Sequence, residues 1–191
     1  MLDIMIDLET MGTSPNSAIV SYGAAAFDYK TGEIGHTIYR VIDLRDTMKY
    51  PEFNIEAGTL YWWLEQSEEA RQALVQDDNR ESLLQAMLSL ETFILGVGNP
   101  HRLRLWGNGP TFDNAMIRYT HRVARGTDLP IPFWNDRCVR TVKGFYPDNM
   151  FKEWRIDNSR RGTYHNALDD AKYQIKYLCH ILKELGVEDL Y

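Results

Sequence analysis

The sequence is poor in cysteine and has no long apolar run, and each absence excludes a class of protein. Its 191 residues include two cysteines, Cys138 and Cys179, which lie far apart and outside any Cys-x-x-Cys or Cys/His pairing. Neither a disulfide framework nor a structural zinc site is therefore indicated. No apolar run approaches the roughly 20 residues of a membrane span, and no basic leader precedes the first apolar run. We expect a soluble, unprocessed, cytoplasmic protein.

Internal repeats, low-complexity tracts and linkers are also missing. The chain is 44% hydrophobic, which over 191 residues is enough to bury a sizeable core. We therefore expect residues 1–191 to form a single domain.

Acidic residues outnumber basic residues in the chain as a whole, but the basic residues are concentrated in one segment. The net charge is −6, yet residues 100–161 carry 12 Lys and Arg against 6 Asp and Glu. A basic segment in an acidic protein is typical of a surface that follows phosphates, although charge runs more often simply face water. The densest part of the segment contains Arg137, Arg140, Lys143, Arg155, Arg160 and Arg161.

Apolar and β-branched stretches predict a sheet. Residues 2–8 form a short apolar run followed by turn-forming residues, which is typical of a buried strand. Residues 19–27 are apolar and residues 34–42 alternate, and the turn sequence at 29–32 between them predicts a hairpin. A further short strand is expected at residues 103–106. The sheet therefore opens with an antiparallel meander.

Helical periodicity dominates the rest of the chain. Helices are expected at residues 57–66, 68–76, 82–95, 112–124 and 138–144, whereas residues 146–164 read as a loop. The final helix begins after Asn166, which caps it, and runs to Leu185, with Gly186 at its end. Strand 103–106, the turn after it and helix 112–124 form a strand-turn-helix unit.

Two acidic residues lie on one face at the end of the first strand. Side chains two positions apart in a strand share a face, so Asp7 and Glu9 project together, roughly 7 Å apart along the backbone. Acidic residues can also simply end a strand and begin a turn, and a lone Asp-x-Glu has little specificity.

Asp113 lies within the inward face of helix 112–124, which Met116, Ile117 and Thr120 mark. A carboxylate on the core side needs a partner. The alternative is that Asp113 stabilises the helix N-terminus by capping or by its charge.

Helix geometry separates the two aspartates of the last helix. Asp170 lies about 110° from the centre of the apolar stripe and Asp169 about 150°, so Asp170 flanks the core and Asp169 faces solvent. His165 lies just before the helix, where an imidazole can take a proton from water near neutral pH. His121 and His180 read as ordinary surface histidines.

These residues predict a metal site if they meet. Four carboxylates gathered in one place must protonate, pair with cations or hold metal. Convergence of Asp7, Glu9, Asp113 and Asp170 would form a site for two divalent cations, with His165 beside it as a base.

The order and spacing of these five residues resemble the DnaQ-like DEDDh family of 3′-5′ exonucleases. The shared pattern is Asp7-Leu8-Glu9, then Phe112-Asp113 in a strand-turn-helix unit, then His165 with Asp170 five positions later. Asn166 stands where the related DEDDy branch has a tyrosine, so the histidine branch fits better. Residues 58–71 also look like the corresponding helix of DexA-type phage exonucleases and of Rv2179c-type exoribonuclease-like proteins.

The resemblance implies an α/β fold of the ribonuclease H type, with a mixed five-stranded sheet flanked by helices. It also implies that Asp7 bridges two Mg²⁺ or Mn²⁺ ions, that Glu9 and Asp170 complete one site, and that Asp113 holds its metal largely through water. His165 would be the general base in a two-metal-ion hydrolysis that releases 5′-mononucleotides from single-stranded 3′ ends.

Family analogy suggests contacts with the terminal nucleotide. The backbone at Thr10, Met11 and Gly12 would meet that nucleotide, and Gly12 permits close approach. Asn108 and Phe112 are candidates for contact with its sugar and base.

Two adjacent tryptophans are candidates for stacking on an unpaired base. Such a contact is typically worth about 1 to 3 kcal/mol. Adjacent helix positions point in different directions, so we expect at most one of Trp62 and Trp63 to stack and the other to lie in the core.

Three functions remain open from the sequence alone. The first is a metal-dependent exonuclease, the second a metal-dependent phosphohydrolase of small nucleotides, which would need no basic groove, and the third a nucleic-acid-binding module without catalysis. DNA and RNA are not distinguished as substrates, because recognition of the 2′-hydroxyl depends on one or two contacts. The oligomeric state is also left open by the sequence, although related small exonucleases are often dimers, which makes a homodimer one candidate.

Overall fold

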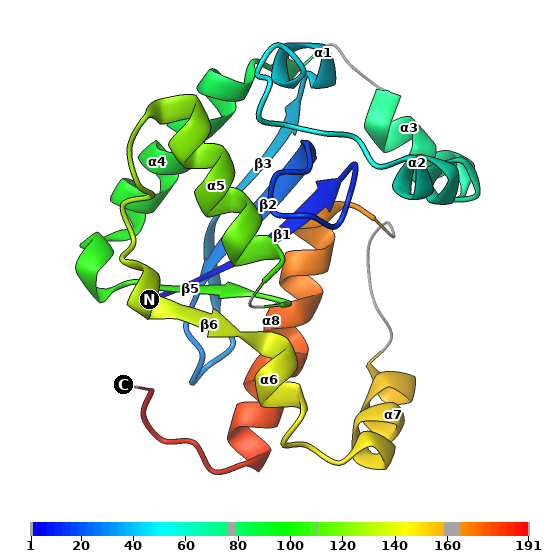
Figure 1. Cartoon of the computed structure of the whole chain (residues 1–191). Helices are drawn as coiled ribbons and strands as arrows, with labels where there is room; N and C mark the ends of the chain where they lie inside the picture. Colours follow the sequence, from blue (N-terminus) through cyan, green and yellow to red (C-terminus); the bar gives the residue numbers. More distant parts are fainter. Residues whose placement is uncertain (1, 76–78, 110, 159–164, 191) are drawn as a thin grey trace.

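A six-stranded mixed sheet forms the centre of the molecule (Figure 1). The computed structural model describes residues 2–75, 79–109, 111–158 and 165–190. The strand order is β4-β3-β2-β1-β5-β6, in which β1 pairs antiparallel with β2, and β2 with β3, while the other pairs are parallel. The strands are β1 (Asp3–Thr10), β2 (Ile19–Phe27), β3 (Ile34–Ile42), β4 (Arg80–Glu81), β5 (Arg104–Gly107) and β6 (Asp136–Cys138).

The expected meander is confirmed, but the strand count of five is wrong. Strands β4 and β6 are two and three residues long, which is too short for any periodic pattern. The hairpin turn between β2 and β3 is stabilised by Asp28, whose carboxylate accepts the backbone N–H groups of Lys30 and Thr31. Gly32 takes the left-handed conformation there, with φ of 75°.

The helices follow the expected positions except for α1 and α7, which the sequence did not predict. The helices are α1 (Leu44–Thr47), α2 (Ala57–Leu64), α3 (Glu68–Val75), α4 (Leu83–Val97), α5 (Asp113–Arg125), α6 (Val139–Lys143), α7 (Asp148–Asp157) and α8 (Ala167–Glu184), with 3-10 turns at Pro100–Arg102 and Phe133–Asn135. Among the described helices, none is both long enough and apolar enough to cross a membrane.

Helix α1 is only four residues long, and α7 occupies part of the stretch that was expected to be a loop. Its aromatic side chains pack on α8, where Phe151 meets Tyr177 with ring centroids 5.5 Å apart and Trp154 meets Tyr173 at 6.2 Å. This contact with a helix that is distant in sequence stabilises α7, in which Phe151 is the one buried residue. Residues 159–164 of the expected loop lie outside the described residues.

The two faces of the sheet bury separate apolar cores. Alternation along β1 turns Ile4, Ile6 and Leu8 toward α4 and α5. Met5 faces the other way, into the core that contains α8. Asp7 and Glu9 lie on the same face of β1 as Met5. The alternation of side chains along the strand therefore directs both carboxylates toward α8.

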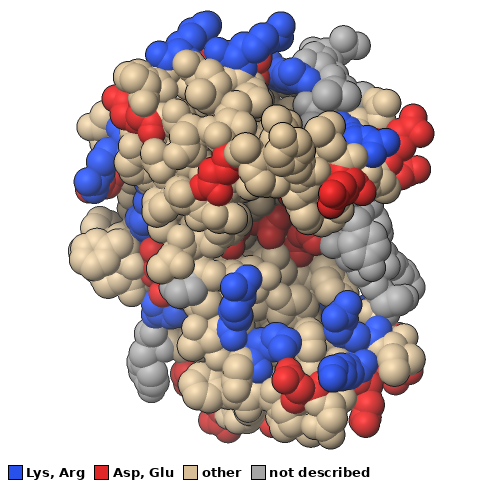
Figure 2. All heavy atoms as spheres, turned by 45° about the vertical axis from the view of Figure 1, so that its right-hand side comes forward, with Lys and Arg blue, Asp and Glu red and all other residues tan. Residues whose placement is uncertain are grey.

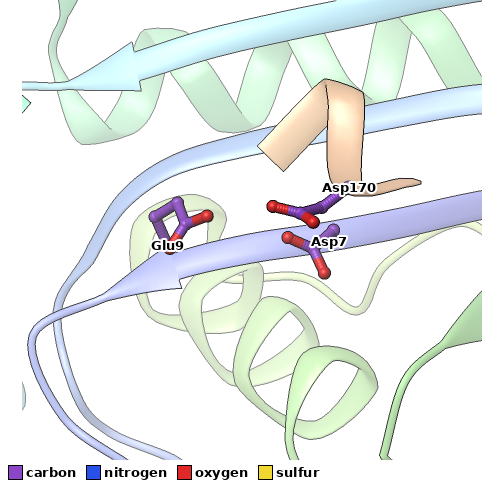
Figure 3. A group of neighbouring side chains, drawn as sticks. All are labelled: Asp7, Glu9 and Asp170. Carbon is purple, nitrogen blue, oxygen red and sulfur yellow. The ribbon is translucent and has the colours of Figure 1, made fainter. Parts of the chain in front are cut away.

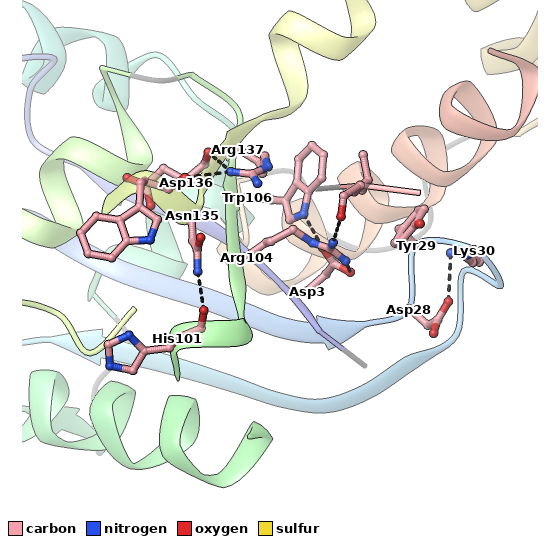
Figure 4. Close-up of polar contacts among 12 residues, drawn as sticks. Asp3, Asp28, Tyr29, Lys30, His101, Arg104, Trp106, Asn135, Asp136 and Arg137 are labelled. Atoms are coloured by element: carbon pink, nitrogen blue, oxygen red, sulfur yellow. Dashed lines mark hydrogen bonds and ion pairs between the residues drawn. The ribbon is translucent and has the colours of Figure 1, made fainter. Parts of the chain in front are cut away.

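A buried ion pair joins β1 to β5 (Figure 4). Arg104 donates Nε to Asp3 Oδ1 at 2.7 Å and an Nη to Oδ2 at 2.8 Å, and Trp106 Nε1 donates to the same Oδ1 at 2.8 Å. The side chain of Asp3 is 1% exposed and that of Arg104 is 12% exposed. Arg104 also donates to the carbonyl of Leu190 at 2.7 Å, so the pair anchors the C-terminal segment.

Replacing Asp3 by asparagine should lower the free energy of unfolding by about 3 to 5 kcal/mol, because it leaves a buried guanidinium without its counter-charge. Urea unfolding measures the loss. Asp189→Asn is the matched control, since Asp189 pairs with Lys30 on the surface, where the two side chains are 65% and 55% exposed. The control should unfold like the parent, and equal midpoints for all three proteins would contradict the assignment.

Candidate active site

Three carboxylates meet at the end of β1 (Figure 3). One oxygen from each of Asp7, Glu9 and Asp170 lies within 4.8 Å of the others. Asp7 and Glu9 come from β1, and Asp170 comes from the first turn of α8. Residues 163 positions apart in sequence are thereby brought into a group that could hold a divalent cation, because hard oxygen ligands suit Mg²⁺ and Mn²⁺.

A glycine on the neighbouring strand lets α8 approach so closely. Gly23 pairs with Asp7 in the register of β1 and β2. A Cβ atom at Gly23 would lie 2.2 Å from the backbone nitrogen of Leu168, which is a collision with main chain. Asn166 caps the helix here by accepting the N–H groups of Leu168 and Asp169. The missing side chain and the cap together hold Asp170 beside Asp7.

Asp113 is the fourth carboxylate and lies at the N-terminus of α5. It is 2% exposed and accepts the backbone N–H of Asn108 at 2.8 Å. Burial raises the pKa of Asp113 to about 6, against the lowering effect of that hydrogen bond. Asp113 does not belong to the close group of three, but after burial its charge is the largest cause that raises the pKa of Asp7.

The electrostatics of the group favour a cation. The pKa of Asp7 is raised well above its usual range by burial and then by the charges of Asp113, Glu9 and Asp170. Without a cation, such a cluster takes up protons. A divalent ion would reverse that tendency, because it stabilises the ionised carboxylates.

His165 lines the same cleft and lies beside two aromatic rings. Its ring centroid lies 5.0 Å from that of Trp62 and 5.8 Å from that of Trp63, both nearly edge to face. Its backbone has φ of 62°, a left-handed conformation that few residues other than glycine adopt. Strain of this kind is found most often at functional sites, where the surrounding structure maintains it.

The cleft has a volume of about 500 Å³ and receives most of the residues expected to touch substrate. Its described lining contains Asp7, Glu9, Thr10, Gly12, Trp62, Trp63, Asn108, Phe112, His165 and Asp170. Met11 is not brought to the cleft. Its side chain is 7% exposed, and its backbone is engaged by the carbonyl of Ala18 and the N–H of Glu56, both at 2.8 Å.

The two tryptophans have different environments. Trp63 is 2% exposed and donates Nε1 to the carbonyl of Thr10 at 2.9 Å, so it belongs to the core and supports the strand end. Trp62 also lines the cleft and is 41% exposed, so it is the more accessible of the two.

Two polar residues of the site were missed by the sequence reasoning. Gln174 is 5% exposed and donates Nε2 to Asp7 Oδ1 at 2.6 Å. Its position one helical turn after Asp170 is a signal that sequence alone offers. Glu56 binds the loop after β1, a contact that no local pattern reveals.

The other histidines and Asp169 differ from expectation. His121 is fully buried rather than on the surface, with Nδ1 3.0 Å from the carbonyl of Thr127. His180 is half-buried and stacks on Trp154 at 5.2 Å. Asp169 is half-buried rather than fully exposed, and it lies outside the close group of three.

Basic side chains lie near the acidic hollow (Figure 2). The figure shows Asp and Glu atoms inside the hollow and Lys and Arg side chains on the surface below it. Arg140 is exposed on α6, and its charge acts on the buried carboxyl of Asp113. Of the basic segment, Arg160 and Arg161 lie outside the described residues.

Solved structures share this fold. The nuclease domain of 3′hExo, a DEDDh family member bound to rAMP, has a TM-score of 0.61 at 16% identity, over 95% of this chain and 92% of that one. Exonuclease I of E. coli in complex with a dA16 oligonucleotide has a TM-score of 0.66 at 14% identity, over 96% of this chain and 41% of the longer protein.

Sequence comparison identifies the family. An exodeoxyribonuclease of Enterobacteria phage T4 is 26% identical over 216 residues, which cover 99% of this chain and 93% of the phage protein. The family described as the 3′-5′ exoribonuclease Rv2179c-like domain matches residues 2–182. The chain therefore belongs to the Rv2179c-like domain family among the DnaQ-like DEDDh exonucleases, and it is a 3′-5′ exonuclease.

Proposed function

We propose that this protein shortens single-stranded DNA or RNA from the 3′ end by metal-dependent hydrolysis and releases 5′-mononucleotides. The observation that carries the proposal is the group of Asp7, Glu9 and Asp170, which opens into a cleft beside His165. An exonuclease requires this combination of a charge-stabilising centre, a base and a channel that admits a chain end.

The residues present fit two Mg²⁺ or Mn²⁺ ions. Asp7, Glu9 and Asp170 would hold the ions directly. Asp113, which lies outside this group of three, would contribute a fourth negative charge. When bound, the ions would supply stabilisation of the negative charge that develops on the phosphate and its leaving oxygen. Gln174 donates to one oxygen of Asp7 and would thereby hold that carboxylate in place.

His165 is proposed as the general base. Its imidazole would accept a proton from the attacking water, which requires the neutral ring within hydrogen-bond reach of that water. Its ring packs against both tryptophan rings at steep angles, and this packing would restrict rotation of the imidazole.

Trp62 is proposed to stack on a base near the 3′ end, while Thr10, Gly12, Asn108 and Phe112 contact the terminal nucleotide. All five line the cleft. Stacking tolerates every base, which suits an enzyme that removes successive nucleotides.

Both polymers are candidates for the substrate. The matched family is named for exoribonuclease activity and the phage relative for exodeoxyribonuclease activity, while the structural neighbours include complexes with dA16 and with rAMP. The homodimer and the cytoplasmic location stay predictions.

Parallel digestion of matched DNA and RNA strands tests the proposal. Each 20-nucleotide strand carries a 5′ label and is incubated with Mg²⁺ or Mn²⁺. We expect a ladder that shortens stepwise from the 3′ end, no cleavage with EDTA, and a preference for one polymer. Turnover of mononucleotides alone, or binding without shortening, would contradict the proposal.

A further inference from the structure

Two segments form one rim of the cleft. The loop at residues 10–17 follows β1, and α2 begins at Ala57. Each segment contributes several residues to the described lining, namely Thr10, Gly12 and Thr13 from the loop and Gly58, Thr59, Trp62 and Trp63 from α2. The relative position of the two segments therefore shapes the side of the cleft where a terminal nucleotide would lie.

One carboxylate joins the two segments. Glu56 Oε1 accepts the backbone N–H of Ser14 at 3.0 Å, the Ser14 hydroxyl at 2.6 Å and the Ser17 hydroxyl at 3.2 Å. Its second oxygen accepts the Thr13 hydroxyl at 3.1 Å. In the backbone, the N–H of Glu56 donates to the carbonyl of Met11 at 2.8 Å.

Glu56 is the N-cap residue of α2 but does not cap the helix with its side chain. A side chain at this position commonly accepts an N–H of the first helical turn. Here the carboxylate binds the loop instead. The hydrogen bonds, that of the Ser14 hydroxyl first, lower the pKa of Glu56 to about 2, so the group is ionised throughout any ordinary assay.

The loop leaves no free space at this contact. A Cβ atom at Gly12 would lie 2.7 Å from Glu56 Cδ and 2.3 Å from Ser17 Oγ. The loop backbone is therefore packed directly against the carboxylate, and a change in the position of Glu56 must move Gly12 and Thr13.

We propose that Glu56 is a positioning residue that holds the loop at residues 10–17 against α2 and thereby sets the affinity for the 3′-terminal nucleotide. The inference rests on the proposed exonuclease function, because it assigns the rim to substrate binding. Glu56 itself is not placed in contact with the reacting phosphate, so its loss should affect binding more than chemistry.

Steady-state kinetics on a short labelled oligonucleotide test the proposal. Glu56→Ala should raise KM by about tenfold and leave kcat within twofold, which is the signature of lost binding shared by ground state and transition state. Glu56→Gln keeps the size and one acceptor oxygen, so its KM should lie between those of Glu56→Ala and the parent. Glu65→Ala, an exposed change at the other end of α2, should leave both constants unchanged.

Two further measurements separate positioning from general damage. Ser14→Ala combined with Glu56→Ala should raise KM no further than Glu56→Ala alone, because both changes break the same contact. Amide hydrogen exchange at residues 11–17 should be faster in Glu56→Ala, and this readout needs no catalysis. If the parent protein digests no oligonucleotide, the proposed exonuclease function is wrong. The hydrogen-exchange comparison would still show whether Glu56 holds the loop.

The proposal is overturned if Glu56→Ala keeps the parent KM, or if kcat falls in parallel with thermal stability. Unchanged exchange at residues 11–17 would also overturn it, since the loop would then be held by other contacts.

Discussion

Asp7→Asn is expected to reduce kcat by about 10³-fold or more while leaving the fold intact. Asp7 is the carboxylate that the other three surround, and asparagine removes its charge and one acceptor oxygen. By transition-state arithmetic, a loss of this size corresponds to about 4 kcal/mol.

The same substitution should not destabilise the metal-free protein. Because the pKa of Asp7 is raised in the folded state, the folded protein favours the protonated form, and ionised Asp7 opposes folding at neutral pH. That unfavourable contribution is fully present above the folded-state pKa, shrinks as the pH falls below that pKa, and vanishes below the unfolded-state pKa. Asparagine resembles the protonated form, so the midpoint of thermal unfolding in EDTA should equal or exceed that of the parent at pH 7.

Kinetics and thermal unfolding on one preparation check both statements. Activity within tenfold of the parent would contradict the role of Asp7. A large drop in the unfolding midpoint would mean that lost structure, and not lost chemistry, explains the inactivity.

His165→Ala should lower kcat by roughly 10² to 10⁴-fold, the usual contribution of a general base. The imidazole is not a member of the carboxylate group, so binding of Mn²⁺ measured by calorimetry should persist.

His36→Ala provides the matched control for this experiment. His36 is exposed on β3 and does not appear in the described lining of the cleft, so its removal should leave kcat and KM unchanged. If His165→Ala were as active as the control, the assignment of the base would be withdrawn.

Local patterns predicted the parts of the fold that local forces determine. The apolar and alternating stretches predicted the meander, and the two-residue period of a strand placed Asp7 and Glu9 on one face. The helical period predicted that Asp170, and not Asp169, flanks the core. The group of Asp7, Glu9 and Asp170 confirms that geometry. Strands β4 and β6 were missed because they are too short for a period, and α7 because its stability comes from aromatic contacts with α8.

The features of the site that the sequence did not reveal have a common cause. The backbone of Met11 is bound by Ala18 and Glu56, and Gln174 reaches Asp7 from α8, which packs on Gly23. These contacts join residues that are distant in sequence, so no window along the chain contains both partners. Sequence reasoning therefore found the charged residues but not the neutral and loop-binding residues that position them.

The central claim is that the carboxylates at the end of β1 bind divalent ions. Anomalous diffraction from crystals soaked in MnCl₂ tests it most directly. We predict two manganese peaks in the cleft, within about 2.5 Å of oxygens from Asp7, Glu9 and Asp170, and no such peaks in crystals of Asp7→Asn. Parent crystals that bind manganese elsewhere but show no peak beside these carboxylates would contradict the account.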